Sequence, residues 1–196
     1  MKTPVSGPPI AAGPSFFRVI GCGNSIASDD ALGIELVERL HASADLSGPD
    51  LCDFSVVPTA GPEMLDLLDA GGTILFVDAV SSGSPPGTLH LIPLPSAFIE
   101  AKPVSSLSSH GWGLLETIEL ARRLKPSLPT MFLLGIELAE LDPFGPQTLA
   151  VERAMERVVE GFPHFVRMLK NPASPLWRGP ERIFPSKQLP WEEPCA

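Results

Sequence analysis

Short apolar runs alternate with longer amphipathic segments along most of the chain. Five runs have the length and composition of buried strands: residues 16–21, 51–57, 73–80, 88–94 and 130–136. Apolar residues recur at helical spacing in four other segments: residues 31–44, 61–70, 113–124 and 148–169. Alternation of strands and helices is typical of a mostly parallel sheet with helices on both faces. The pattern therefore predicts an α/β fold in a single domain.

The last helical segment, residues 148–169, has the most regular apolar pattern in the chain. Its apolar positions step by four and three residues, as expected for one buried face of a helix: Val151, Met155, Val158, Phe162, Phe165 and Leu169. Pro163 lies inside this pattern and lacks the N–H group of a helical hydrogen bond. We therefore expect the helix to kink, or to split, near Gly161.

Proline-rich segments mark both ends of the predicted domain. Residues 1–15 and 171–196 contain repeated prolines and little periodic apolar pattern. Proline fixes φ and removes a backbone donor, so such segments favour extended chain over packed elements. We predict one α/β domain over residues 16–170, flanked by proline-rich tails at 1–15 and 171–196.

Charge and cysteine content narrow the possible functions. The net charge of −9 disfavours a nucleic acid as partner. The three cysteines, Cys22, Cys52 and Cys195, form no C-x-x-C pair, which argues against a disulfide framework and indicates a reducing compartment. No segment has the roughly 18 consecutive apolar residues of a membrane helix, and prolines and glycines interrupt the N-terminal residues. We expect a cytoplasmic protein that binds neither membranes nor nucleic acid.

Residues 21–33, GCGNSIASDDALG, follow the first predicted strand and lead into a predicted helix. G-x-G at this place opens the dinucleotide-binding fingerprint, but Ile26 stands where a third small residue is needed. Two aspartates would also repel a pyrophosphate held at the helix N-terminus, so the pattern disfavours nucleotide binding. Asp29 is a favoured type of helix N-cap, which explains one aspartate. Asp30 remains open to a functional or a purely structural role.

Two further residues with ligand-type side chains lie in predicted loops. Asp78 closes the apolar run ILFVDA, where a carboxylate is costly unless it is paired, coordinated or used to cap the following turn. His110 lies in the small polar segment SSLSSHGWG, which opens a predicted helix. A single histidine more often has a structural role, so His110 gains weight only in combination with the two acids.

Asp30, Asp78 and His110 are expected to meet, because parallel sheets gather functional loops at the carboxyl ends of their strands. Two carboxylates and one imidazole would give a three-ligand site with an open position. Such a donor set suits a divalent ion such as Zn²⁺ or Ni²⁺. A divalent ion in an open site can polarise a carbonyl and activate water, which are the requirements of amide hydrolysis.

The same residues resemble a known family, the hydrogenase maturation proteases, which process the large subunit of nickel–iron hydrogenases. The matching stretches occur in the family's order over roughly residues 17–140: VIGCGNSIASDDALG, TAGPEMLDLL, LFVDAVSSGSPPGTLHL and SSHGWGLLETIELARRL. Each motif alone is weak, whereas their combination is fairly specific. The resemblance implies a three-layer α/β/α sandwich around a mostly parallel sheet.

The resemblance also implies the reaction and its partner. The protein would be an endopeptidase that cleaves the C-terminal extension of a nickel–iron hydrogenase large-subunit precursor after nickel insertion. Asp30, Asp78 and His110 would be the catalytic and metal-contacting residues, and the metal would be Ni²⁺ supplied by the precursor, although other divalent ions could occupy the site.

One departure from the family pattern leaves alternatives open. Where the family usually carries an acid ahead of the TAG motif, this chain has Val56, Val57 and Pro58. A nearby acid such as Asp53 or Glu63 would replace it, or this branch docks its substrate differently, or the activity is weakened or lost. The alternatives are a non-catalytic, nickel-sensing assembly chaperone and another hydrolase on a related fold, similar to peptidyl-tRNA hydrolases, which also open with a strand and G-x-G-N.

Overall fold

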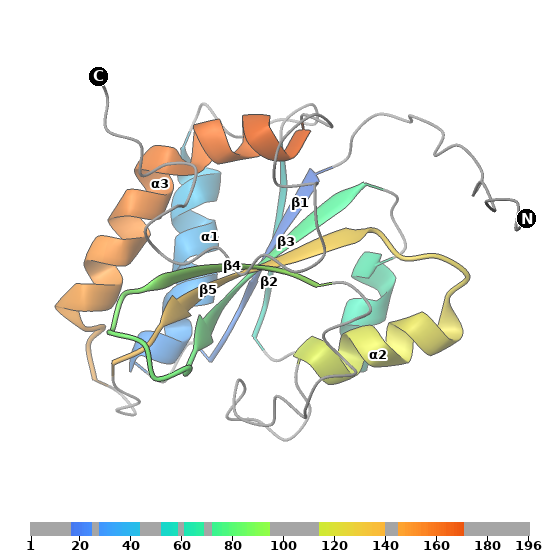
Figure 1. Ribbon diagram of the computed structural model, residues 1–196, viewed down its shortest axis with the longest axis horizontal. Helices are drawn as coiled ribbons and strands as arrows, with labels where there is room; N and C mark the ends of the chain where they lie inside the picture. Colours follow the sequence, from blue (N-terminus) through green and yellow to red (C-terminus); the bar gives the residue numbers. More distant parts are fainter. Residues whose placement is uncertain are drawn as a thin grey trace, which may run out of the picture.

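A five-stranded sheet with the strand order β2-β1-β3-β5-β4 forms the centre of the molecule (Figure 1). The structure is a computed structural model that describes residues 17–24, 28–43, 52–58, 61–68, 72–94, 114–139 and 145–170. Its strands are β1 (Phe17–Cys22), β2 (Asp53–Val57), β3 (Thr73–Val80), β4 (Leu89–Pro93) and β5 (Thr130–Glu137). Among the strands that the structure describes, β2, β1, β3 and β5 are parallel, and β4, at one edge, runs antiparallel to its neighbour β5. The prediction of a mostly parallel sheet is confirmed.

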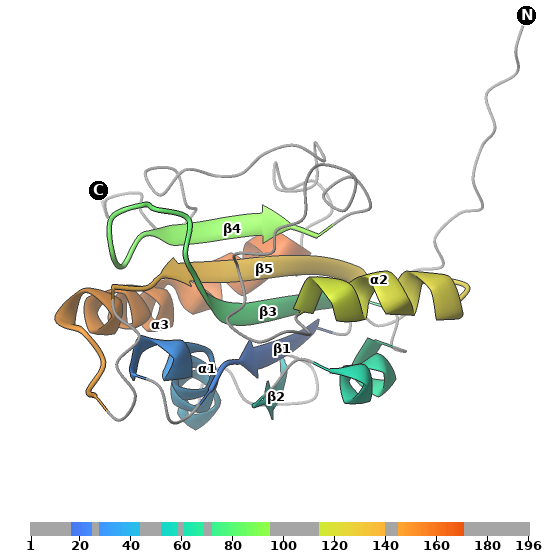
Figure 2. The ribbon, with the colours of Figure 1, turned by 90° about the horizontal axis from the view of Figure 1, so that it is seen from below.

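Helices cover both faces of the sheet, as Figure 2 shows. On one face α1 (Leu32–Ala42) packs beside α3 (Leu149–Lys170), and their apolar side chains join those of the strands in one core. On the other face α2 (Leu114–Leu124) packs beside the 3₁₀ helix η2 (Pro62–Leu68) over a second core. A short 3₁₀ helix, η1 (Ser28–Ala31), leads into α1. The α/β/α sandwich is therefore confirmed.

Two helical expectations are refined by the structure. Residues 62–68 form a 3₁₀ helix, in which the Met64 N–H donates to the Gly61 carbonyl three residues back at 2.9 Å. α3 continues through Pro163 as one helix, and Figure 1 shows it bending along its length. None of the described helices is both long and apolar enough to cross a membrane. The predicted tails, residues 1–15 and 171–196, lie outside the described residues and stay a prediction.

Candidate functional site

The glycines of GCGNSIASDDALG allow the start of α1 to pack closely on the end of β1. A Cβ atom at Gly33 would collide with the carbonyl oxygen of Cys22, so the helix can approach the strand only with glycine here. Gly23 has a φ of 140° and faces the carbonyl of Asp30, which also accepts a hydrogen bond from the Asn24 N–H at 3.2 Å. These contacts hold Asp30 at the carboxyl end of β1.

Asp29 does not cap α1, and this expectation is wrong. The N-cap residue of α1 is Ala31, which makes no side-chain capping bond. The carboxylate of Asp29 is fully buried and accepts hydrogen bonds from the Ala139 N–H at 2.9 Å and the Thr148 N–H at 2.8 Å. It also accepts one from the Thr148 hydroxyl at 3.0 Å. Asp29 therefore joins η1 to the segments that follow β5 and precede α3.

Asp78 lies near the carboxyl end of the central strand β3. In the sheet its backbone pairs with Gly135 of β5, and the preceding Val77 pairs with Gly21 of β1. The side chain is half-buried, and one carboxylate oxygen accepts a hydrogen bond from the Ala79 N–H at 2.9 Å. Asp78 thus stands between the two strands whose ends carry the glycine loop and the loop after β5.

The environment of Asp78 opposes its ionisation. Burial, and then the negative charge of Asp30, raise the pKa of Asp78 to about 7, against a smaller opposing effect of the Ala79 hydrogen bond. Asp30 is itself buried. The two acids are therefore near enough for one charge to act on the other, as expected from their places in the sequence. A carboxyl group that changes ionisation near neutral pH is typical of functional sites, although structural networks produce such shifts too.

Cys22, the last residue of β1, is buried near Asp78. Burial, and then the charge of Asp78, raise the pKa of the Cys22 thiol well above its usual value. The thiolate is the form that attacks substrates and binds metals, and these surroundings oppose its formation. We interpret Cys22 as a packing residue under the site.

His110, the third residue of the predicted trio, lies outside the described residues. Within the described part of the chain, no three His, Cys, Asp or Glu side chains are grouped closely enough to hold a metal ion. The structure therefore brings together Asp30 and Asp78 but does not test the position of His110. The role of all three as site residues stays a prediction.

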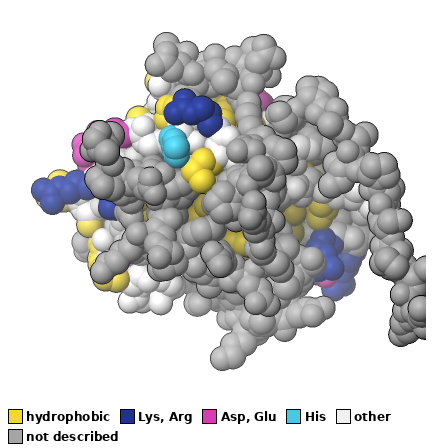
Figure 3. All heavy atoms as spheres, turned by 45° about the horizontal axis from the view of Figure 1, so that its top comes forward, with side chains coloured by type: hydrophobic (Ala, Val, Ile, Leu, Met, Phe, Trp, Pro, Cys, Tyr) yellow, Lys and Arg dark blue, Asp and Glu magenta, His cyan; other side chains and the backbone are white. Residues whose placement is uncertain are grey.

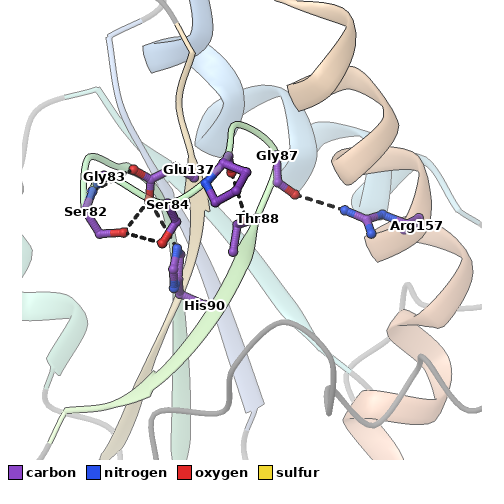
Figure 4. Close-up of polar contacts among 9 residues, drawn as sticks. Ser82, Gly83, Ser84, Gly87, Thr88, His90, Glu137 and Arg157 are labelled. Carbon is purple, nitrogen blue, oxygen red and sulfur yellow. Dashed lines mark hydrogen bonds and ion pairs between the residues drawn. The ribbon is translucent and has the colours of Figure 1, made fainter.

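Sequence reasoning missed Glu137, the last residue of β5. Its side chain is almost completely buried, and its carboxylate contacts Ser82 and Gly83 in the turn that follows β3 (Figure 4). One carboxylate oxygen accepts hydrogen bonds from the N–H groups of Ser82 at 2.7 Å and Gly83 at 2.8 Å. The other accepts bonds from the Ser82 hydroxyl at 2.7 Å and from Nε2 of His90 at 3.1 Å. An acid at the end of an otherwise apolar strand was the available signal.

These hydrogen bonds keep Glu137 ionised. Burial alone would raise the pKa of Glu137, but the hydrogen bonds from Ser82, Gly83 and His90 together outweigh it, so that the pKa lies below its ordinary value. Glu137 is thus a fixed anion that organises the connection between β3 and β4. Arg157 of α3 donates to the Gly87 carbonyl at 2.9 Å and holds the other end of this connection (Figure 4).

The structure also separates the two acids considered as replacements for the missing one near Val56. Asp53 lies at the amino end of β2, where its carboxylate forms an ion pair with Arg18 at 2.7 Å. This is the opposite edge of the sheet from Asp78, so Asp53 does not replace the missing acid. Glu63 is exposed on η2, which follows the carboxyl end of β2, and it remains a candidate.

The surface drawn in Figure 3 carries its described Lys and Arg side chains in separate groups. A protein that tracks a nucleic-acid backbone needs several cations in a continuous line. The described part of this face shows no such line.

The protein is thus an α/β/α sandwich in which two acids, Asp30 and Asp78, lie together at the carboxyl edge of the sheet. A family model described as hydrogenase maturation protease matches residues 34–162. Because that match covers most of the chain, the protein belongs to the hydrogenase maturation protease family.

Curated relatives and solved structures agree with this assignment. The hydrogenase expression/formation protein HupD of Thiocapsa roseopersicina is 30% identical over 154 residues, covering 72% of this chain and 67% of HupD. The hydrogenase 2 maturation protease of Escherichia coli (strain K12) is 28% identical over 146 residues, covering 72% of this chain and 85% of the relative. The structure of the hydrogenase maturating endopeptidase HybD from E. coli superposes with a TM-score of 0.65 at 26% identity, covering 78% and 92% of the two chains.

Proposed function

We propose that this chain is an endopeptidase that removes the C-terminal extension of a nickel–iron hydrogenase large-subunit precursor after nickel insertion. The observation that carries the proposal is the pair of interacting acids, buried Asp30 and half-buried Asp78, at the carboxyl edge of the sheet in a member of this family. We further propose that the reaction takes place in the cytoplasm, where the odd number of cysteines without a pairing pattern fits a reducing environment.

The proposed role of Asp30, Asp78 and His110 is to contact the nickel that arrives with the precursor. Carboxylate oxygens and imidazole nitrogen are suitable ligands for Ni²⁺. Burial, and then repulsion by Asp30, raise the pKa of Asp78, and a cation between the two acids would offset both effects so that both acids could ionise together. Precursors that carry nickel would therefore bind better than those without it.

The reaction adds water across one peptide bond of the precursor. The water oxygen bonds to the carbonyl carbon, and one proton passes to the leaving amine. The substrate's nickel can polarise the carbonyl and favour ionisation of water. Asp78, with a pKa of about 7, can accept or release a proton at neutral pH, which is the property required of a general base or acid.

The test is incubation of the full chain with a nickel-loaded large-subunit precursor, followed by intact-mass spectrometry. We expect a single shortened product with the parent chain and none with a nickel-free precursor. Asp30→Ala and His110→Ala should each abolish processing, whereas both variants should keep the parent's circular dichroism spectrum. If either variant processes the precursor as fast as the parent, the proposed site is wrong.

A second candidate function follows from Val56 and Val57, which stand where the family usually carries an acid. If the chain binds the nickel-loaded precursor stably without any change in its mass, it is an assembly chaperone that retains nickel sensing. Restoring an acid with Val56→Asp should then introduce cleavage. Failure of the parent and of this variant to bind the precursor would contradict both candidate functions.

A further inference from the structure

The three residues Glu137, Leu138 and Ala139, at and just after the end of β5, are hydrogen-bonded to η1, which carries Asp30, and to the end of β3, the strand that carries Asp78. Ala139 donates its N–H to Asp29, the neighbour of Asp30 in η1. Leu138 donates its N–H to the Val80 carbonyl at 3.0 Å, just beyond Asp78 in β3. The Glu137 carboxylate holds Ser82 and Gly83 in the turn that follows.

We propose that Asp29 and Glu137 are positioning residues, which fix the Asp30 loop and the end of the Asp78 strand on this one segment and so set the spacing of the acid pair. We call residues 137–139 the brace. This inference rests on the proposed function, because it assigns the two carboxylates to the same site. It adds two residues that do not touch the substrate themselves.

The first end of the brace restrains Asp30 through its neighbour. Asp29 is fully buried, and its hydrogen bonds reach two separate segments, at Ala139 and at Thr148. A carboxylate that accepts several backbone and hydroxyl donors has little freedom to move without breaking them. The backbone of Asp30 is additionally held by the Asn24 N–H, so the carboxylate of Asp30 projects from a fixed point.

The second end of the brace restrains the strand that bears Asp78. The backbone of Glu137 is also held. Its N–H donates to the Thr88 carbonyl, and its carbonyl accepts from the Gly87 N–H, both at 2.8 Å. Its carboxylate holds Ser82 and Gly83 from below, so the β3–β4 connection is fixed at both ends. The turn cannot shift without breaking several of these bonds at once.

A purely structural role would require only that these bonds stabilise the fold. Their arrangement carries more, because successive residues of one segment hold both η1 and the end of β3, and Asp78 itself pairs with Gly135 of β5. Catalytic geometry is sensitive to small displacements, and an error of about 1 Å can cost roughly 100-fold in rate. Loosening the brace should therefore reduce turnover more than an equal loss of stability elsewhere.

The experiment compares variants at Glu137, in the brace, and at Thr148, which helps to hold Asp29, with a control on β5. Glu137→Ala removes the carboxylate, and Glu137→Gln keeps its shape and one carbonyl acceptor. Thr148→Val removes one donor to Asp29 at nearly constant volume, and Thr148→Ser restores it. Met131→Ala creates a cavity in the core nearer the amino end of β5. Met131 lies four residues before Gly135, which is about 13 Å along the strand. The substrate is the nickel-loaded precursor, and melting temperatures are measured for every variant.

We expect Glu137→Ala and Thr148→Val to lower kcat by roughly tenfold or more with KM little changed. Glu137→Gln and Thr148→Ser should recover most of the loss, and Met131→Ala should lower the melting temperature while keeping the parent's kcat. If Glu137→Ala and Thr148→Val have the kcat of the control at an equal loss of melting temperature, the brace is structural only and the inference is overturned.

Crystal structures of the parent, Glu137→Ala and Thr148→Val decide the inference independently of activity. We expect the separation of the Asp30 and Asp78 carboxyl groups to change in both variants. An unchanged separation overturns the inference even where the parent processes the precursor. If the parent does not process it, the proposed function fails, and the change or constancy of this separation still decides whether the brace positions the acids.

Discussion

Asp78 and Glu137 stand near the carboxyl ends of neighbouring strands, and their surroundings shift their pKa values in opposite directions. Burial and the charge of Asp30 raise the pKa of Asp78 to about 7. At Glu137, hydrogen bonds from Ser82, Gly83 and His90 outweigh burial and lower the pKa. The carboxylate that the protein satisfies internally belongs to the scaffold. The carboxyl group whose ionisation the protein opposes is the one that gains most from a cation brought by a substrate.

The largest effect is expected on the free energy of unfolding when Asp78→Asn is compared with the parent. Between about pH 4 and 7 the folded parent holds a proton on Asp78 that the unfolded chain releases, because the folded pKa is raised from 3.8 to about 7. Parent stability therefore falls as pH rises through this window, and the cost is fully present above it. We expect Asp78→Asn to be more stable than the parent at about pH 8, by up to about 4 kcal/mol.

Urea denaturation of both proteins at about pH 4, 6 and 8 measures this difference. It should be small near pH 4, where Asp78 is protonated in the folded chain and still partly protonated in the unfolded chain. Equal pH dependence in the two proteins would show that Asp78 has an ordinary pKa and would remove the contrast with Glu137.

The second effect is on the pH dependence of processing. If the substrate's nickel requires the ionised form of Asp78, kcat/KM should fall about tenfold per pH unit below the pKa. With a pKa of about 7, Asp78 is half ionised at pH 7, and we expect a decrease of about 50-fold between pH 7 and pH 5. Initial rates of precursor processing across this range provide the measurement, and a flat profile would contradict the assigned role.

The third effect, at Glu137, should have the opposite sign to that at Asp78. Glu137→Ala leaves the Ser82, Gly83 and His90 donors without their carboxylate, and we expect it to cost about 1–3 kcal/mol at neutral pH. Because the folded pKa is lowered from 4.5, the stabilisation by the charge is present above that value and is lost as pH falls through the folded pKa. Denaturation at neutral and acid pH tests this. A variant as stable as the parent at neutral pH would show that the hydrogen bonds to the Glu137 carboxylate contribute nothing to the free energy of unfolding.

The smallest effect is expected at the other edge of the sheet, with Asp53→Asn. The Arg18–Asp53 ion pair has a carboxylate side chain that is 45% exposed, so its loss should cost no more than about 1 kcal/mol. Processing should be unchanged, since this pair lies at the amino ends of β1 and β2. A large loss of processing in Asp53→Asn would instead show that Asp53 takes the place of the acid that this chain lacks near Val56.

The elements of the sheet were predictable because each is a short apolar run bounded by polar or turn residues. Thr73–Val80 shows this best, since the predicted and observed strands coincide. The proximity of Asp30 and Asp78 was predictable as well, because both follow parallel strands and must meet at one edge. Residues 61–70 were less readable, since their apolar spacing fits an α-helix and a 3₁₀ helix equally over so short a segment.

The roles of Asp29 and Glu137 could not be predicted, because they depend on partners far along the chain. Asp29 has the residue type and the sequence position of an N-cap, yet the backbone groups that bond its carboxylate lie 110 and 119 residues further along the chain. Glu137 meets Ser82 from 55 residues away. Local propensity identifies neither contact, because each exists only after β5 has been placed beside β3.

The central claim is that Asp78 acts on the substrate while Glu137 serves the scaffold, and one measurement tests it directly. Asp78→Asn and Glu137→Gln each replace a carboxylate by an amide of the same shape on neighbouring strands. Both variants and the parent are incubated with the nickel-loaded precursor, and intact-mass spectrometry follows the shortened large subunit. We predict no product with Asp78→Asn and a rate within a few-fold of the parent with Glu137→Gln. Processing by Asp78→Asn at the parent's rate would contradict the account.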